Sequence, residues 1–133
     1  MHMLMPVLTG VYAAILGLLG AALTVNVIVN RVRSGIDAGD GGVARLAQAI
    51  RAHANFVEQT PLTLIVIAFA EALGTGSLIV HGLNAALLAT RLASGYALNR
   101  SLAQSPLRQF GGGLSILVAV AASITVFIRM IAT

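Results

Sequence analysis

The sequence predicts an all-α membrane protein, a single four-helix bundle in which each helix crosses the bilayer. Hydrophobic residues make up 58% of the 133 residues, charged residues only 9%, and mean hydropathy is +0.94. A soluble domain has about 25% charged residues, so this composition indicates a membrane environment. Four long apolar segments follow one another, separated by short polar loops. We expect one integral membrane domain over residues 1–133, with spans at about 6–30, 43–73, 78–98 and 110–128.

The first span, residues 6–30, is long enough to cross about 30 Å of hydrocarbon at about 1.5 Å per residue. The first 30 residues contain no Asp, Glu, Lys or Arg. A signal peptide would have a basic start and an apolar part of only about 7–15 residues, so we expect this helix to be retained. Gly10, Gly17 and Gly20 offer small faces for close helix packing.

The second helix is expected to run from near Val43 to near Gly74, with Asp40 as its N-cap. Within this helix, only residues 59–70 form an uninterrupted uncharged stretch, which is too short to span a bilayer alone. The polar stretch 51–58 must therefore lie partly inside the membrane or at its interface.

A tight turn at residues 74–77 leads to the third span, and a loop with Pro106 leads to the fourth. Five arginines lie in or beside the first and third loops, and none lies in the second. The positive-inside rule therefore places the first and third loops in the cytoplasm and both termini on the other side. Arg129 is the exception. The arginines that set this orientation are Arg31, Arg33, Arg45, Arg100 and Arg108.

The stretch RAHANFVEQTPL, residues 51–62, places polar groups directly before an apolar run. On an ideal helix Arg51, Asn55 and Glu58 lie within about 60° of each other, whereas His53 lies on nearly the opposite side. Arg51 and Glu58 are about 10 Å apart along the axis, which is long for a direct ion pair, but Asn55 can bridge between them. Pro61 removes one backbone hydrogen bond and can kink the helix.

Two interpretations of this stripe stay open. Its residues can neutralise one another and join helices by hydrogen bonds. Alternatively they form a site for a polar ligand, because a charged side chain at the bilayer centre costs about 2.5–3.5 kcal/mol on insertion scales.

Several other polar residues could each have more than one role. Arg91 can line the same groove, reach the interface or pair with Glu58; Tyr96 lies about 140° from it on an ideal helix. Arg108 is expected at the interface, where it can simply anchor the topology. Glu71 is expected to be solvated at the end of its helix.

Several classes of function are disfavoured by the sequence. There is no cysteine, so disulfides and Cys-based metal sites are excluded. His53 has no partners at metal-ligand spacing, so no metal is expected. The net charge of +4 comes from scattered arginines without a basic patch, so no nucleic acid is expected as a partner. The glycine run at 111–113 follows no predicted strand, unlike a phosphate-binding loop.

The chain resembles the MAPEG family, the membrane-associated proteins in eicosanoid and glutathione metabolism. Chain length and the four-span layout agree over essentially the whole chain, and GDGGVARLAQAI at residues 39–50 resembles the bacterial branch. The residues that carry the resemblance open the second span: Arg51, Asn55, Glu58, Pro61 and Leu62.

The resemblance implies a homotrimer in a bacterial inner membrane, with glutathione as co-substrate between subunits near the cytoplasmic side. It implies a glutathione-dependent transferase or peroxidase that takes a lipophilic electrophile from the membrane lipids. Arg108 resembles the arginine before the fourth span that is proposed to stabilise the glutathione thiolate, and is the candidate catalytic residue. The candidate binding residues are Arg51, Asn55, Glu58, His53, Arg31, Arg33, Arg91 and Tyr96.

The chain departs from the family pattern at Ser94 and Leu98, where relatives often carry a histidine or aromatic residue and a tyrosine. Gln59 also replaces a tyrosine found in some relatives. The alternative is therefore a non-catalytic lipid-binding or scaffolding protein that uses the same cleft. A small four-span multidrug transporter would carry its key glutamate in the first span, which has no acidic residue here.

Overall fold

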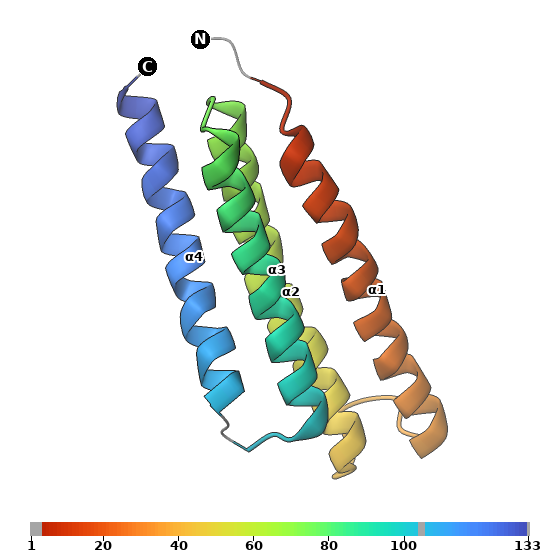
Figure 1. The fold of residues 1–133 in the computed structure, drawn as a ribbon. Helices are drawn as coiled ribbons and strands as arrows, with labels where there is room; N and C mark the ends of the chain where they lie inside the picture. The colour runs from red at the N-terminus through yellow and green to blue at the C-terminus, as the bar shows by residue number, and fades with distance from the viewer. Residues whose placement is uncertain (1–3, 104–105, 133) are drawn as a thin grey trace.

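The fold is a bundle of four long α-helices. The computed structural model describes residues 4–103 and 106–132, apart from the side chains of Leu107 and Arg108, and these residues form no strand. The all-α prediction is confirmed for them. The helices are α1 (Val7–Ser34), α2 (Ala44–Ala72), α3 (Ser77–Arg100) and α4 (Pro106–Ile131) (Figure 1).

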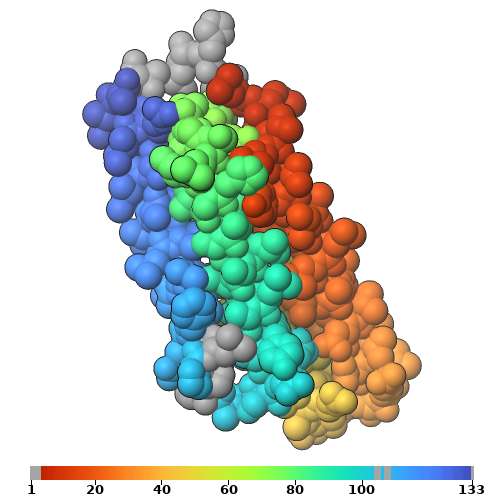
Figure 2. Space-filling model, viewed as in Figure 1, coloured from red at the N-terminus to blue at the C-terminus, as the bar shows by residue number. Residues whose placement is uncertain are grey.

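The helices α2 and α3 form the centre of the bundle. Within the described residues, α1 packs on α2 and α3, α4 packs on the same two helices, and the backbones of α1 and α4 are not neighbours. Figure 2 shows one face of this arrangement, on which α1 and α4 flank α3. The start of α1, the α2–α3 turn and the end of α4 lie at one end of the bundle (Figure 1). We call this the turn end, and the opposite end, with residues 35–43 and 101–103, the loop end.

Large apolar side chains cover the outside of the bundle. Leu18, Leu78 and Phe127 are 75%, 85% and 68% exposed, whereas soluble monomers rarely expose large contiguous apolar patches. By length and composition, two helices among the described residues can cross a membrane, α1 and the 109–131 part of α4. Only 11% and 17% of their most apolar windows are buried, unlike the core helix of a soluble protein. That α2 and α3 also span stays a prediction.

The interior combines aliphatic and small side chains. One cluster joins all four helices, and a second lies among α1, α2 and α3 around Leu23, Ala52 and Leu98. Of the three glycines expected to allow close packing, Gly20 lies against a neighbour: a Cβ there would be 2.9 Å from Cε1 of Phe56. The first cluster consists of Leu16, Ile67, Val80, Leu87, Val118 and Ala122.

The start of α2 differs from the sequence prediction. Val43 is the N-cap, and no side chain caps the helix. The prediction that Asp40 caps it is wrong, because Gly41 and Gly42 adopt positive φ and turn the chain before the helix begins. Asp40 Oδ1 instead accepts a hydrogen bond from the backbone N–H of Gly42 at 2.9 Å.

The turn end is held together by Glu71. Its Oε1 accepts from the N–H of Leu8 at 2.8 Å, and its Oε2 accepts from the N–H of Thr9 at 2.7 Å. The first N–H groups of a helix have no partner within that helix, so Glu71 caps α1 from α2. The prediction that Glu71 is solvated is wrong, because its carboxylate binds two backbone N–H groups of α1. These groups lie more than 60 residues away in the sequence, so no local pattern indicates the contact.

Candidate functional site

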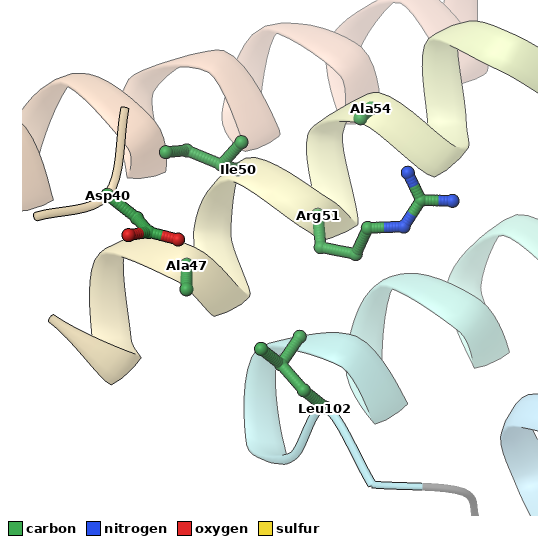
Figure 3. Close-up of a pocket in the computed structure, with 6 residues that line it drawn as sticks. All are labelled: Asp40, Ala47, Ile50, Arg51, Ala54 and Leu102. Carbon is green, nitrogen blue, oxygen red and sulfur yellow. The ribbon is translucent and has the colours of Figure 1, made fainter. Parts of the chain in front are cut away.

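Arg51 and Glu58 lie on the exposed face of α2 toward the loop end. Nη1 and Nη2 of Arg51 each donate to one carboxylate oxygen of Glu58, both at 3.3 Å. The separation along the axis is long for a direct ion pair, yet the pair forms because the long arginine side chain lies along the helix axis, past Ala54 (Figure 3). The two side chains remain 46% and 53% exposed, so the pair is open to solvent or to a ligand.

Asn55 does not bridge this pair. Its side-chain Oδ1 and its backbone carbonyl accept hydrogen bonds from Nη1 of Arg91, at 3.2 and 3.3 Å. Asn55 is half-buried, with Arg51 and Glu58 before and after it on the helix. The stripe therefore has an exposed part, the ion pair, and an inner part that connects α2 to α3.

Arg91 lies in the interior of the bundle and is only 2% exposed. Besides Asn55, it donates to Oγ1 of Thr90 at 3.3 Å and to Oγ of Ser115 on α4. Of the sequence alternatives, pairing with Glu58 is not observed among the described residues. The guanidinium is held by neutral oxygens from α2, α3 and α4, directly behind the stripe.

A pocket of about 370 Å³ lies beside Arg51 at the loop end. Asp40 lies at one side of it, and the Arg51 side chain extends away from Asp40 (Figure 3). The sequence did not indicate Asp40 or Leu102 as wall residues, because both come from loops that only the fold brings to α2. The lining residues are Asp40, Ala47, Ile50, Arg51, Ala54 and Leu102.

Tyr96 lines a different groove, of about 440 Å³, between α1 and α3. Tyr96 is 55% exposed, and the guanidinium carbon of Arg100 lies 4.9 Å from its ring centroid. Leu19, Leu23 and Leu92 give this groove apolar walls. Within one chain, Tyr96 and the Arg51 side chain therefore line separate hollows.

The other predicted site residues lie apart from the ion pair. Arg31 donates to the carbonyls of Ile36 and Gly39, at 3.3 and 3.0 Å, and so holds the first loop against the end of α1. Arg33 is exposed in the last turn of α1, and His53 is half-buried on α2. Arg108 lies in the first turn of α4, and its side chain lies outside the described part of the chain.

Ser94 and Leu98, the two departures on α3, are 4% and 2% exposed. These positions are therefore packed inside the bundle rather than at the ion pair. Among the described residues, no three acidic or histidine side chains come together in a way that could hold a metal ion.

Comparison with known proteins agrees with this architecture. A sequence model of the MAPEG family matches residues 9–128. The inner membrane protein YecN of Escherichia coli K12 is 33% identical over 94 residues, which cover 71% of this chain and 72% of YecN. YecN of the O6:H1 strain matches equally well, and no solved structure gives a significant match. The family match extends over nearly the whole bundle, including the Arg51–Glu58 stripe, and so this chain belongs to the MAPEG family.

Proposed function

We propose that this chain is an integral protein of a bacterial inner membrane that binds glutathione at Arg51, Asn55 and Glu58. Glutathione then serves as co-substrate for transfer to a lipophilic electrophile, or for reduction of a lipophilic hydroperoxide. The observation that carries the proposal is the exposed Arg51–Glu58 ion pair on α2, in a member of the MAPEG family. The inner membrane location is supported by the name of the YecN relative.

The charges of the stripe are complementary to those of glutathione. The tripeptide has two carboxylates and one ammonium group, which suit an arginine and a glutamate. In the free protein these two side chains satisfy each other at the surface, and an exposed pair contributes only about 0–1 kcal/mol. Opening it therefore costs little, and each side chain gains a charged partner on the ligand.

The remaining predicted residues complete the site in the proposed homotrimer. The apolar outer faces of α1 and α4 are available for membrane lipids and neighbouring subunits. Arg31, Arg33, His53 and Tyr96 would meet the ligand across the subunit boundary, with the loop end facing the cytoplasm.

Arg108 is our proposed catalytic residue. A free thiol has a pKa of about 8.5, and a nearby cation favours the thiolate by about 1.36 kcal/mol for each unit by which the pKa falls. The thiolate attacks the electrophilic carbon, a carbon–sulfur bond forms, and the leaving group departs with the bonding electrons. The protein needs no cysteine of its own for this reaction.

A second candidate function is a non-catalytic lipid-binding or scaffolding role. The identities of Ser94 and Leu98 favour it, because the family resemblance leads us to expect a histidine or aromatic residue and a tyrosine at these two buried positions. The apolar groove between α1 and α3 offers room for an acyl chain.

The test uses the purified protein in mild detergent. Glutathione binding is measured by calorimetry, and conjugation is measured with a generic aromatic halide. We expect Arg51→Ala to weaken binding at least about tenfold, since a charged hydrogen-bonded contact is worth about 1.5–3 kcal/mol. Arg45→Ala is the matched control, because Arg45 is an exposed arginine at the start of the same helix.

Three results are informative. Absence of glutathione binding by the wild type would overturn the proposal. Binding without conjugation would favour the lipid-binding alternative. Equal losses for Arg51→Ala and Arg45→Ala would show general electrostatic attraction and would remove the stripe as the site.

A further inference from the structure

Arg91 is a buried arginine whose partners among the described residues are all uncharged. Its side chain is 2% exposed, and its three nitrogens all donate to oxygens of Asn55, Thr90 or Ser115. Helices α2, α3 and α4 each supply at least one of these oxygens. Burying a charge is costly unless it is fully hydrogen-bonded, so this arrangement holds the guanidinium in one place.

This arrangement fixes the orientation of the Asn55 side-chain amide. Arginine has five N–H donors and no acceptor. The amide must therefore turn its oxygen toward Arg91, because the flipped amide would place two donors against each other. The usual ambiguity between the O and N of an asparagine is removed here by the chemistry of the neighbour.

The nitrogen of the amide, Nδ2, therefore points away from Arg91. No described residue accepts a hydrogen bond from Nδ2 of Asn55. Only Thr60 Oγ1 and Asn84 Oδ1 are buried side-chain polar atoms without a partner in the described chain. Nδ2 is therefore accessible, and it belongs to the same stripe as Arg51 and Glu58.

We propose that Arg91 is a positioning residue that makes Asn55 present a hydrogen-bond donor to the ligand. The site then has a cation at Arg51, a fixed N–H donor at Asn55 and an anion at Glu58. A ligand must place an oxygen acceptor, a carboxylate or a peptide carbonyl, opposite Asn55. The inference rests on the proposed function, since it assigns a role in the same site, and Arg91 itself does not touch the ligand.

The first test is the nearly isosteric variant Asn55→Asp. The carboxylate still accepts from Arg91, so helix packing is retained, but it has no donor for the ligand and repels a ligand oxygen. We expect glutathione affinity to fall at least about tenfold, at least as far as in Asn55→Ala, with an unfolding temperature no lower than that of wild type. Wild-type affinity in Asn55→Asp would overturn the inference.

The second test is a double-mutant cycle with Arg91→Met, which keeps the volume but releases the amide. In this background the amide can turn, so Asn55→Ala should cost less affinity than in wild type. Glu58→Gln should cost the same factor in both backgrounds. A purely structural role of Arg91 would change both factors alike. An Asn55→Ala factor that is the same in both backgrounds would overturn the inference.

A third measurement needs no ligand. The side-chain amide resonances of Asn55, assigned by their loss in Asn55→Asp, should shift in Ser115→Ala and in Arg91→Met, because the first change removes one partner of the guanidinium and the second removes the guanidinium itself. Unchanged resonances would overturn the orienting role. Failure of wild-type protein to bind glutathione would overturn the proposed function, yet shifted resonances would still support the orientation of Asn55.

Discussion

The two ends of the bundle each combine a glutamate of α2 with an arginine, and they use these charges in different ways. At the turn end, Glu71 accepts from two backbone N–H groups of α1, and Arg129 of α4 donates to the backbone carbonyl of Gly74. Toward the loop end, Glu58 and Arg51 bind each other on the surface. Backbone groups are fixed by the fold, whereas a surface side chain can exchange its partner.

This difference separates structure from function. The turn-end charges join α1 to α2 and α4 to the α2–α3 turn, so their removal should weaken the fold. The Arg51–Glu58 pair connects two positions of one helix, so its removal should leave the fold intact and change only what binds there. Arg91 combines the two roles, because its hydrogen bonds join α3 to α2 and α4 and, in our proposal, also orient Asn55 for the ligand.

The largest expected effect on the free energy of unfolding is that of removing Glu71, compared with Glu58 on the same helix. Glu71→Ala leaves two helix-terminal N–H groups without their charged acceptor, and should lower the free energy of unfolding by about 3 kcal/mol. Glu58→Ala, the matched control, should cost less than about 1 kcal/mol. Unfolding in mixed micelles, followed by circular dichroism, measures both. Equal losses would remove the distinction between the two ends.

The second effect concerns the packing behind the exposed pair. A Cβ on Gly111 would lie 2.5 Å from Oγ of Ser94 and 3.4 Å from the carbonyl oxygen of Thr90, so α3 and α4 approach closely beside Arg91. Gly111→Leu should therefore destabilise the bundle by about 2 kcal/mol, as overpacking does.

Gly113→Leu is the control for this prediction, because Gly113 is exposed and a Cβ there meets nothing within 4 Å. The same unfolding assay compares the two variants. If Gly113→Leu were the more damaging change, the outer face of α4 would be packed against a neighbouring subunit instead.

The sequence alone predicts the helices and the stripe, but not the contacts between distant segments. Apolar segment lengths located the four helices, and helical periodicity placed Arg51, Asn55 and Glu58 on one stripe. Counting axial rise underestimated the reach of the arginine side chain, so the direct ion pair was missed. The Glu71 cap, the Arg91–Asn55 contact and the pocket position of Asp40 join residues far apart in the chain, and no local pattern reports such contacts.

A third, smaller effect is expected for Arg129. This residue was the exception to the charge distribution, and the structure gives it a partner at the turn end, the carbonyl of Gly74. Arg129→Met should lower the free energy of unfolding by about 1.5 kcal/mol, because a charged donor to that carbonyl is lost. Arg45→Met, at an exposed position, should change it by less than about 0.5 kcal/mol. Indistinguishable melting curves for the two variants would contradict a structural role of Arg129.

The smallest effect is the coupling within the exposed pair itself. A double-mutant cycle with Arg51→Ala and Glu58→Ala should give a coupling free energy of about 0.5 kcal/mol at low salt. At about 1 M salt the coupling should fall toward zero, because the Debye length is then about 3 Å. Unfolding of the four proteins at both salt concentrations provides the measurement. A coupling above about 2 kcal/mol that survives high salt would mean that the pair is structural, and a ligand could not open it at the low cost that the proposed glutathione site requires.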